Sequence, residues 1–195
     1  MKPADVAQWQ AARTLADLGE VTARFLEGEI GETPSHLGPP VAETTPLIPV
    51  LAAVNRAGFV THQSQPGVAP GRGGSAQRAN VSGFASDATF SRLMTLVAGA
   101  ELVITAARGL PEDWQPSVVV TIVDGAPYTR DGGSERAGDL EYYYAEYCHP
   151  DAIKALCEAW QVTFIDPVWG RNDQLWPLLQ KFAADAGAPV IPPPR

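Results

Sequence analysis

Glycine and proline interrupt this chain at short intervals, and their spacing limits the length of every helix and strand. The 195 residues include 18 glycines and 18 prolines. Both residue types favour turns and loops over the interiors of regular elements. A chain of this length is also too short for a (β/α)8 barrel. We therefore expect one globular unit of short elements joined by many loops.

Apolar periodicity predicts five helices. Apolar residues recur every three or four positions from about Asp5 to Glu27, which indicates one amphipathic helix. A second helix is expected near Thr44 or Thr45, whose hydroxyl groups can cap it. A third follows Ser86-Asp87, and the last two are expected at 150–160 and 173–186.

Short runs rich in β-branched or aromatic residues predict strands between these helices. They lie at 58–62, 101–107, 117–123, 142–147 and 162–165. Asp124-Gly125 is a turn signal after the third run. Polar or glycine-rich segments at 28–40, 67–74 and 130–138 are expected to be loops. The interleaved order predicts a mixed α/β (α+β) fold.

Charge and composition exclude several classes of function. The chain has 14 Lys and Arg against 22 Asp and Glu, a formal net charge of −8. A general nucleic-acid binder would carry a basic surface, so no nucleic-acid partner is expected. The chain has no apolar run of membrane-spanning length. Residues Met1–Gln10 lack the apolar core of a signal peptide, and Cys148 and Cys157 are too few for a disulfide scaffold. We expect a cytoplasmic protein.

Common catalytic and metal-binding patterns are missing from the sequence. The glycine-rich segment 67–74 lacks the Gly-Lys-Ser/Thr of a P-loop and the spacing of a dinucleotide fingerprint, so a surface loop is expected there. His36, His62 and His149 are scattered without the spacing of a zinc site, and no metal is predicted. No G-x-S-x-G nucleophile sequence occurs.

The segment 43–66 is the most unusual part of the chain. Glu43 and Thr44 stand at the start of a predicted helix, while Thr61 and Ser64 stand at the end of a predicted strand. A tight turn between the two elements would bring these ends together. The carboxylate, the hydroxyls and free helix N–H groups would then line a small polar site. Alternatively, the hydroxyls are only helix caps and Asn55-Arg56 only closes a turn.

This segment resembles a known family. It contains Glu43-Thr44, then ten residues, then Asn55-Arg56-Ala57-Gly58-Phe59-Val60-Thr61, then Ser64-Gln65-Pro66. That spacing is similar to the pattern ET-(x10)-NRxG(I/F)(L/V)T-x-x-SQP of the C-terminal regulatory domain of eukaryotic methylenetetrahydrofolate reductase. A looser similarity covers 90–107 and 164–182, the latter with the sequence NDQLW. The resemblance extends over 41–182 and leaves the first helix and 125–147 unaligned.

The resemblance implies an α/β domain that binds S-adenosylmethionine or S-adenosylhomocysteine as a regulatory ligand. In the family, the Glu and Thr of the ET pair, the strand Thr and the Ser of SQP contact this ligand. They correspond to Glu43, Thr44, Thr61 and Ser64, and a further ligand-contacting threonine corresponds to Thr121. A carboxylate such as Glu43 would favour the cationic sulfonium over the neutral thioether. The family's flavin-binding catalytic barrel has no room here, so neither reductase activity nor a flavin is expected.

Three functions follow from this reading. The leading hypothesis is a stand-alone sensor or regulator that binds the nucleoside ligand. Under this hypothesis the chain consists of an N-terminal helix and loop (1–40), a ligand-binding domain (41–187) and a Pro-rich tail (188–195). The second is a transferase or lyase that consumes the ligand, with His62, Tyr144 and Glu146 as acid–base candidates. The third is a protein-interaction module with a vestigial pocket. A protein partner and a homodimer remain open, and no catalytic residue is assigned.

Overall fold

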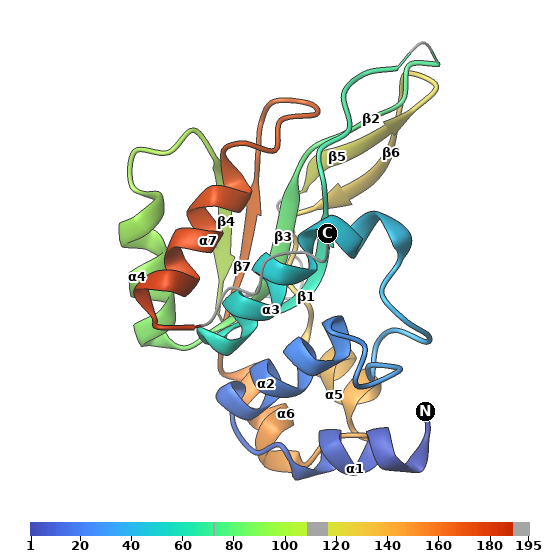
Figure 1. Cartoon of the computed structure of the whole chain (residues 1–195), viewed down its shortest axis with the longest axis vertical. Coiled ribbons are helices and arrows are strands. Elements are labelled where there is room, and N and C mark those ends of the chain that lie inside the picture. Colours follow the sequence, from blue (N-terminus) through green and yellow to red (C-terminus); the bar gives the residue numbers. More distant parts are fainter. Residues whose placement is uncertain (72, 109–116, 189–195) are drawn as a thin grey trace.

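The computed structural model of the chain describes residues 1–71, 73–108 and 117–188. Within these residues, seven α-helices, one 3-10 helix and seven strands are present, and the strands form two antiparallel sheets (Figure 1). The predicted mixed α+β class is therefore confirmed.

The larger sheet lies at the centre of the molecule and has the strand order β1-β3-β7-β4. Its strands are β1 (Phe59–Gln65), β3 (Asn80–Ala85), β7 (Trp160–Ile165) and β4 (Val103–Ala107), and each neighbouring pair is antiparallel. The side chains of Phe59, Phe84 and Phe164 on this sheet are fully buried. Burial of large aromatic side chains is a main source of stability in a core of this size.

Three helices pack together beside this sheet (Figure 1). They are α3 (Ile48–Arg56), α4 (Asp87–Val97) and α7 (Leu175–Asp185). The hydroxyl of Ser86 accepts a hydrogen bond from the N–H of Thr89, which caps α4 where the sequence predicts a helix start. Helix α3 contacts β1, α7 and α2, so it joins the sheet to the second helical layer.

Four further helices form the lower part of the molecule in Figure 1. They are α1 (Pro3–Ala11), α2 (Leu15–Leu26), α5 (Ala137–Tyr144) and α6 (Pro150–Cys157). Trp9, Leu18 and Leu156 from this layer belong to the same hydrophobic cluster as Phe84 and Phe164 of the sheet. The first helices and the sheet therefore share one core.

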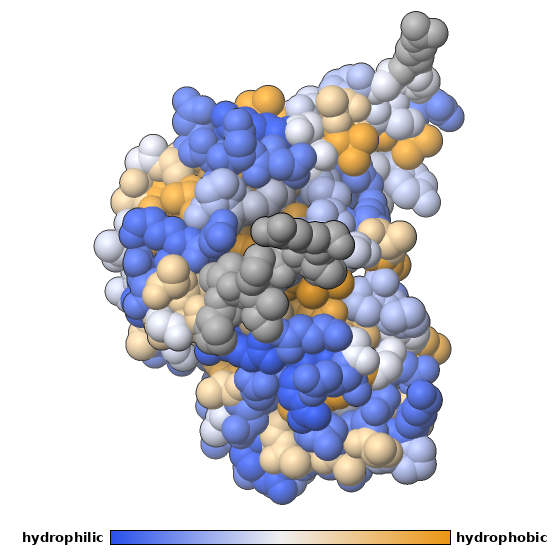
Figure 2. All heavy atoms as spheres, in the orientation of Figure 1, coloured by the Kyte–Doolittle hydropathy of each residue, from blue (hydrophilic) through white to orange (hydrophobic). Residues whose placement is uncertain are grey.

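The smaller sheet forms an arm that projects from the upper end of the molecule (Figure 1). Its order is β2-β5-β6, with β2 (Ala76–Gln77), β5 (Val118–Val123) and β6 (Ala126–Asp131). The predicted turn at Asp124-Gly125 is confirmed, since both residues have positive φ (52° and 77°). Figure 2 shows apolar residues among polar ones on this arm, and Val68 and Val123 are exposed.

The helix predicted from Asp5 to Glu27 is in fact two helices. The chain leaves α1 after Ala11, and Thr14 starts α2 with a capping box in which its hydroxyl and the Asp17 carboxylate bond each other's backbone N–H. This cap satisfies N–H groups that a helix start leaves free. Apolar spacing continues across the break because both helices face the same core.

The strand predicted at 142–147 is wrong. Helix α5 continues to Tyr144, and Leu140 and Tyr144 are buried four residues apart on one side of the helix, while Tyr142 is exposed. A short aromatic run can belong to either kind of element, and packing decides between them. The loop predicted at 130–138 is also shorter, because β6 reaches Asp131 and α5 begins at Ala137.

Two other boundaries differ from the prediction. The helix expected near Thr44 begins as a 3-10 helix, η1 (Ala42–Leu47), which continues into α3. The helix predicted at 150–160 ends at Cys157, and Trp160 instead opens β7. Both differences arise where one element runs directly into the next, so apolar spacing gives no clear end.

Candidate functional site

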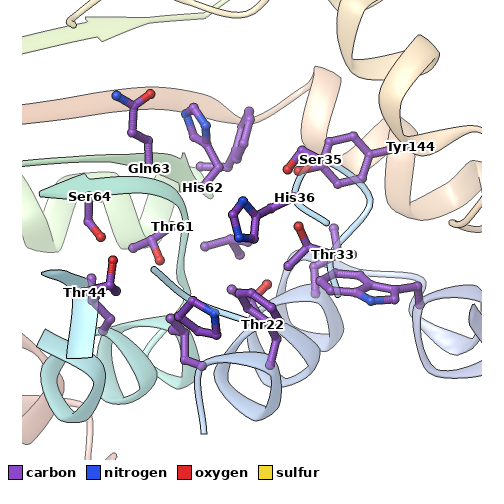
Figure 3. A pocket seen from close by; sticks show the side chains of 18 of the residues that line it. Thr22, Thr33, Ser35, His36, Thr44, Thr61, His62, Gln63, Ser64 and Tyr144 are labelled. Carbon is purple, nitrogen blue, oxygen red and sulfur yellow. The ribbon is translucent and has the colours of Figure 1, made fainter. Parts of the chain in front are cut away.

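A cavity of about 280 Å³ lies between the two helical layers and the edge strand β1. Its walls come from α2, the loop 28–40, η1 and β1, with single side chains from α1, α3, β3, α5 and α6 (Figure 3). This volume is close to the lower end of the roughly 300–1,000 Å³ typical of small-molecule sites. The apolar part of the lining includes Trp9, Leu18, Phe25 and Phe84.

Hydroxyl groups supply much of the polar lining. Three of the predicted ligand residues, Thr44, Thr61 and Ser64, line the cavity together. Figure 3 shows their oxygens directed toward the same region between η1 and β1. Thr44 and Thr61 are buried within the fold. The sequence proposal that the start of one element meets the end of another is therefore realised for these three residues.

Asn55 fixes the position of Thr61. Its Oδ1 accepts the backbone N–H of Thr61 at 2.9 Å, and its Nδ2 donates to Thr61 Oγ1 at 2.7 Å and to the Leu51 carbonyl at 2.8 Å. Asn55 is completely buried. Gly58, with a φ of +96°, makes the turn that returns the chain from α3 to β1. The end of α3 thereby holds the first half of β1 in place.

Arg56 anchors the same turn to α2. Its guanidinium donates to both oxygens of Glu27, at 2.6 and 2.7 Å, and also to Glu20. The Arg56 guanidinium lowers the pKa of Glu27 below its ordinary value of 4.5, although partial burial acts in the opposite direction. Bidentate pairs of this geometry are among the stronger ion pairs in proteins. They tie the α2 wall of the cavity to the α3–β1 wall.

The loop 28–40 forms a wall that the sequence did not predict. Thr33, Ser35 and His36 line the cavity from this loop, and the His36 ring lies edge-on to Phe25 with centroids 6.2 Å apart. Burial raises the pKa of Tyr144 to about 12, and a hydrogen bond with Ser35 opposes this rise. Tyr144 is therefore a neutral phenol at physiological pH.

Glu43 and Thr121, the two other predicted ligand residues, do not line this cavity. Glu43 is exposed, and its Oε2 accepts a hydrogen bond of 3.4 Å from Gln77. Thr121 lies on β5 of the arm and donates to Gln65 Oε1 at 3.3 Å. Thr121 therefore supports the junction between the two sheets, while Glu43 lies one residue from the cavity and faces outward.

The side chains that line the cavity are uncharged, except that His36 and His62 can be protonated. The residues that the structure places around the cavity include no Asp, Glu, Lys or Arg side chain. An ion transferred into such a site would lose hydration without gaining a counter-charge. The geometry is therefore suited to an uncharged, partly apolar group that has several hydrogen-bonding atoms.

Comparison with protein families gives one result. The chain matches the family described as "Domain of unknown function (DUF6919)" over residues 4–186. The chain belongs to the DUF6919 family. A search of curated proteins finds no match. The match includes all of α1 except Pro3, together with α2 and the loop 28–40, so every residue that lines the cavity lies within the matched range.

A second, polar hollow of about 380 Å³ adjoins the cavity of the DUF6919 domain. His62 and Gln63 line both, and a register shift between Thr61 and Gln63 leaves His62 without a partner on β3. Desolvation lowers the pKa of His62, whereas Asp131 and Glu135 oppose this.

The described residues show neither a metal-binding cluster nor a membrane-spanning helix. No cluster of three or more His, Cys, Asp or Glu side chains arranged to hold a metal ion occurs among them. None of their helices has the length and apolar character needed to cross a membrane. Burial raises the pKa of the Cys148 thiol to about 12, so this residue of the DUF6919 domain is an inert core thiol.

Proposed function

We propose that this DUF6919 domain is a small-molecule-binding module whose ligand is S-adenosylmethionine or S-adenosylhomocysteine, and that it acts as a sensor or regulator. One observation carries the proposal. Thr44, Thr61 and Ser64, which the family resemblance implies as ligand contacts, lie on one cavity of ligand-binding size. Their grouping is independent of the resemblance, since it depends only on how η1 and β1 pack.

The residues that line the cavity suit a nucleoside. Apolar side chains such as Trp9 and Phe25 can cover the faces of a base, and the hydroxyl groups can bond its edge or a ribose. The position of Glu43 changes one expectation. Because this carboxylate faces away from the cavity, its preference for the sulfonium would act only at the rim.

The positions and protonation states of the acid–base candidates favour binding without turnover. Tyr144 stays protonated near neutral pH, and Glu146 is exposed outside the cavity lining. His62 lies on the wall, but desolvation lowers its pKa, so its neutral form is favoured. Mass spectrometry of the ligand after hours with the protein distinguishes the two functions, since a binding module returns the ligand unchanged.

Titration calorimetry tests the proposal directly. Both ligands are expected to bind the wild-type protein and to bind Thr44→Val about five- to tenfold more weakly, the usual effect of one lost hydrogen bond. The Thr44 hydroxyl has no hydrogen-bond partner among the described residues, so the fold should tolerate this change. Thr95→Val, on the exposed surface of α4, is the matched control. Absence of binding by folded wild-type protein would refute the proposal.

A further inference from the structure

We infer that Thr61 donates a hydrogen bond to an uncharged acceptor on the nucleoside part of the ligand. Asn55 is the positioning residue, because its own hydrogen bond to the Thr61 hydroxyl leaves the hydroxyl proton for the ligand. The inference rests on the proposed function, because it assigns a chemical role within the same cavity. The role concerns the kind of ligand atom that binds Thr61. Asn55, which lies outside the cavity lining, determines how the Thr61 hydroxyl is oriented.

The orientation of the Asn55 amide is fixed by its backbone partners. The Leu51 carbonyl can only accept a hydrogen bond, and the Thr61 N–H can only donate one. Nδ2 must therefore face the Leu51 carbonyl at 2.8 Å, and Oδ1 must face the Thr61 N–H at 2.9 Å. Reversing the amide would break both bonds within a fully buried site. No other placement of Oδ1 and Nδ2 satisfies the hydrogen bonds of the Asn55 amide.

This orientation determines the role of the Thr61 hydroxyl. The amide Nδ2 lies 2.7 Å from Thr61 Oγ1, so Asn55 donates and Thr61 accepts. A hydroxyl group has one proton to donate in addition to its lone pairs. The described residues offer this proton no acceptor, and the hydroxyl lies on the cavity wall. The proton is therefore available to an acceptor on the ligand.

The lining limits the charge of that acceptor. A carboxylate placed against Thr61 would have no Lys or Arg side chain among the residues around the cavity. Desolvation of an unpaired anion is far more costly than desolvation of a carbonyl oxygen or a ring nitrogen. The acceptor is therefore an uncharged atom of the base or the ribose. The charged amino-acid part of the ligand lies away from Thr61.

A panel of three ligands tests the assignment. S-adenosylmethionine, S-adenosylhomocysteine and 5′-methylthioadenosine share the nucleoside, and only the last lacks the amino-acid group. Thr61→Val is expected to weaken all three by a similar factor, about tenfold. Thr61→Ser keeps the donor and should bind all three within about twofold to threefold of wild type. Binding is measured by calorimetry, and melting temperatures show that each variant is folded.

Asn55→Asp tests the positioning role, because it keeps the shape but replaces the donor to Thr61 with an acceptor; it also removes the bond to the Leu51 carbonyl, so the melting temperature is measured beside the affinity. The new carboxylate would take the Thr61 proton, so ligand affinity should fall about as much as in Thr61→Val. Combining Asn55→Asp with Thr61→Val should cause no further loss, since both remove the same interaction. A purely structural role predicts additive losses instead. If Asn55→Asp does not fold, the Thr61 variants alone decide the assignment.

The outcomes separate the inference from the proposed function. Equal affinity of wild type and Thr61→Val, with binding intact, would overturn the inference and leave the binding function standing. A loss confined to the two ligands with an amino-acid group would overturn it too, since the acceptor would then be the carboxylate. If none of the three ligands binds wild-type protein, both the function and the inference are refuted.

Discussion

Asn172 holds the backbone of Gly67 through both polar atoms of its side chain. Its Oδ1 accepts the Gly67 N–H at 2.8 Å, and its Nδ2 donates to the Gly67 carbonyl at 2.9 Å. Oδ1 also accepts the indole N–H of Trp176 at 3.1 Å. The sequence NDQLW near the C-terminus is therefore joined to the segment directly after Ser64-Gln65-Pro66. Two regions that are distant in the sequence form one structural unit.

Replacing Asn172 with Ala is expected to destabilise this unit. The variant loses both bonds to Gly67, the bond to the Gly170 carbonyl and the partly buried bond from the Trp176 indole. Water can replace the exposed bonds, so we expect a loss of about 1–2 kcal/mol in the free energy of unfolding. Urea denaturation measures this value. The neighbouring variant Asp173→Ala, also exposed, should stay within about 0.5 kcal/mol of wild type. Equal values for the two variants would contradict a structural role for Asn172.

The close approach of α2 to α3 gives a second prediction. A Cβ atom added at Gly19 would lie 2.3 Å from the carbonyl oxygen of Asn55, where the backbone cannot move easily. Gly19→Ala should therefore cost about 1–3 kcal/mol in unfolding free energy. It should also weaken ligand binding, because the displaced residue is the one that positions Thr61.

The control for this change is another glycine-to-alanine substitution in a helix. Gly138 lies in α5, and an added Cβ would meet no atom within 4 Å. Because alanine favours the helix over glycine, Gly138→Ala should leave stability unchanged or raise it by up to about 1 kcal/mol. A melting temperature of Gly19→Ala equal to that of Gly138→Ala would show that the two helices can separate at no cost.

The helices and strands with strong local signals could be predicted from the sequence. Ser86 caps α4 as expected, and Gly58 ends α3, because cap and turn preferences depend on a few neighbouring residues. The break at Thr14 was missed although its capping box is also local, since continuous apolar spacing concealed it. The aromatic run of α5 fits either kind of element until Leu140 and Tyr144 pack into the core.

The candidate site could be predicted only in part. Thr44, Thr61 and Ser64 come from one continuous segment, so a single turn was enough to place them together. The wall from the loop 28–40 depends on contacts between residues far apart in the sequence, such as the hydrogen bond from the Trp9 indole to the Glu32 carbonyl and the ring contact of His36 with Phe25, which no local pattern reports. The sequence gives only a weak indication that this loop lines a site, because polar residues such as Thr33, Ser35 and His36 are common in loops.

The buried carboxylate of Asp166 gives a third prediction. Both of its oxygens accept from Arg171 Nε, at 2.8 and 2.7 Å, and Oδ1 also accepts the Val168 N–H. Asp166→Asn would weaken these bonds and leave the guanidinium without its buried counter-charge. Since Arg171 is partly exposed, we expect a loss of about 2–3 kcal/mol, below the figure for a fully buried pair.

Glu101 provides the comparison for Asp166. It also pairs with Arg171, at 3.2 Å, but its side chain is 78% exposed. Exposed ion pairs contribute little, so Glu101→Gln should change the free energy of unfolding by less than about 1 kcal/mol. Guanidinium denaturation of both variants measures which one loses more unfolding free energy. A larger loss for Glu101→Gln than for Asp166→Asn would show that burial does not set the strength of these pairs.

The ion pair between Glu27 and Arg56 predicts how stability depends on pH. The hydrogen bonds from Arg56 lower the pKa of Glu27 in the folded protein below its ordinary value of 4.5. The unfolded state therefore binds the proton more readily. The pair contributes stability above the unfolded pKa, and that stability is lost as the pH falls through the folded pKa. Glu27→Gln should remove this contribution, about 1 kcal/mol at neutral pH.

Urea denaturation of wild type and Glu27→Gln from about pH 7 to about pH 3 measures the effect. The difference in unfolding free energy should be constant near neutrality and shrink below 4.5, the ordinary pKa of the side chain. Glu20 also pairs with Arg56, but its side chain is 51% exposed, so Glu20→Gln should show a smaller difference over the same range. A difference for Glu27→Gln that does not change with pH would mean that the substitution acts through packing and not through the charge of Glu27.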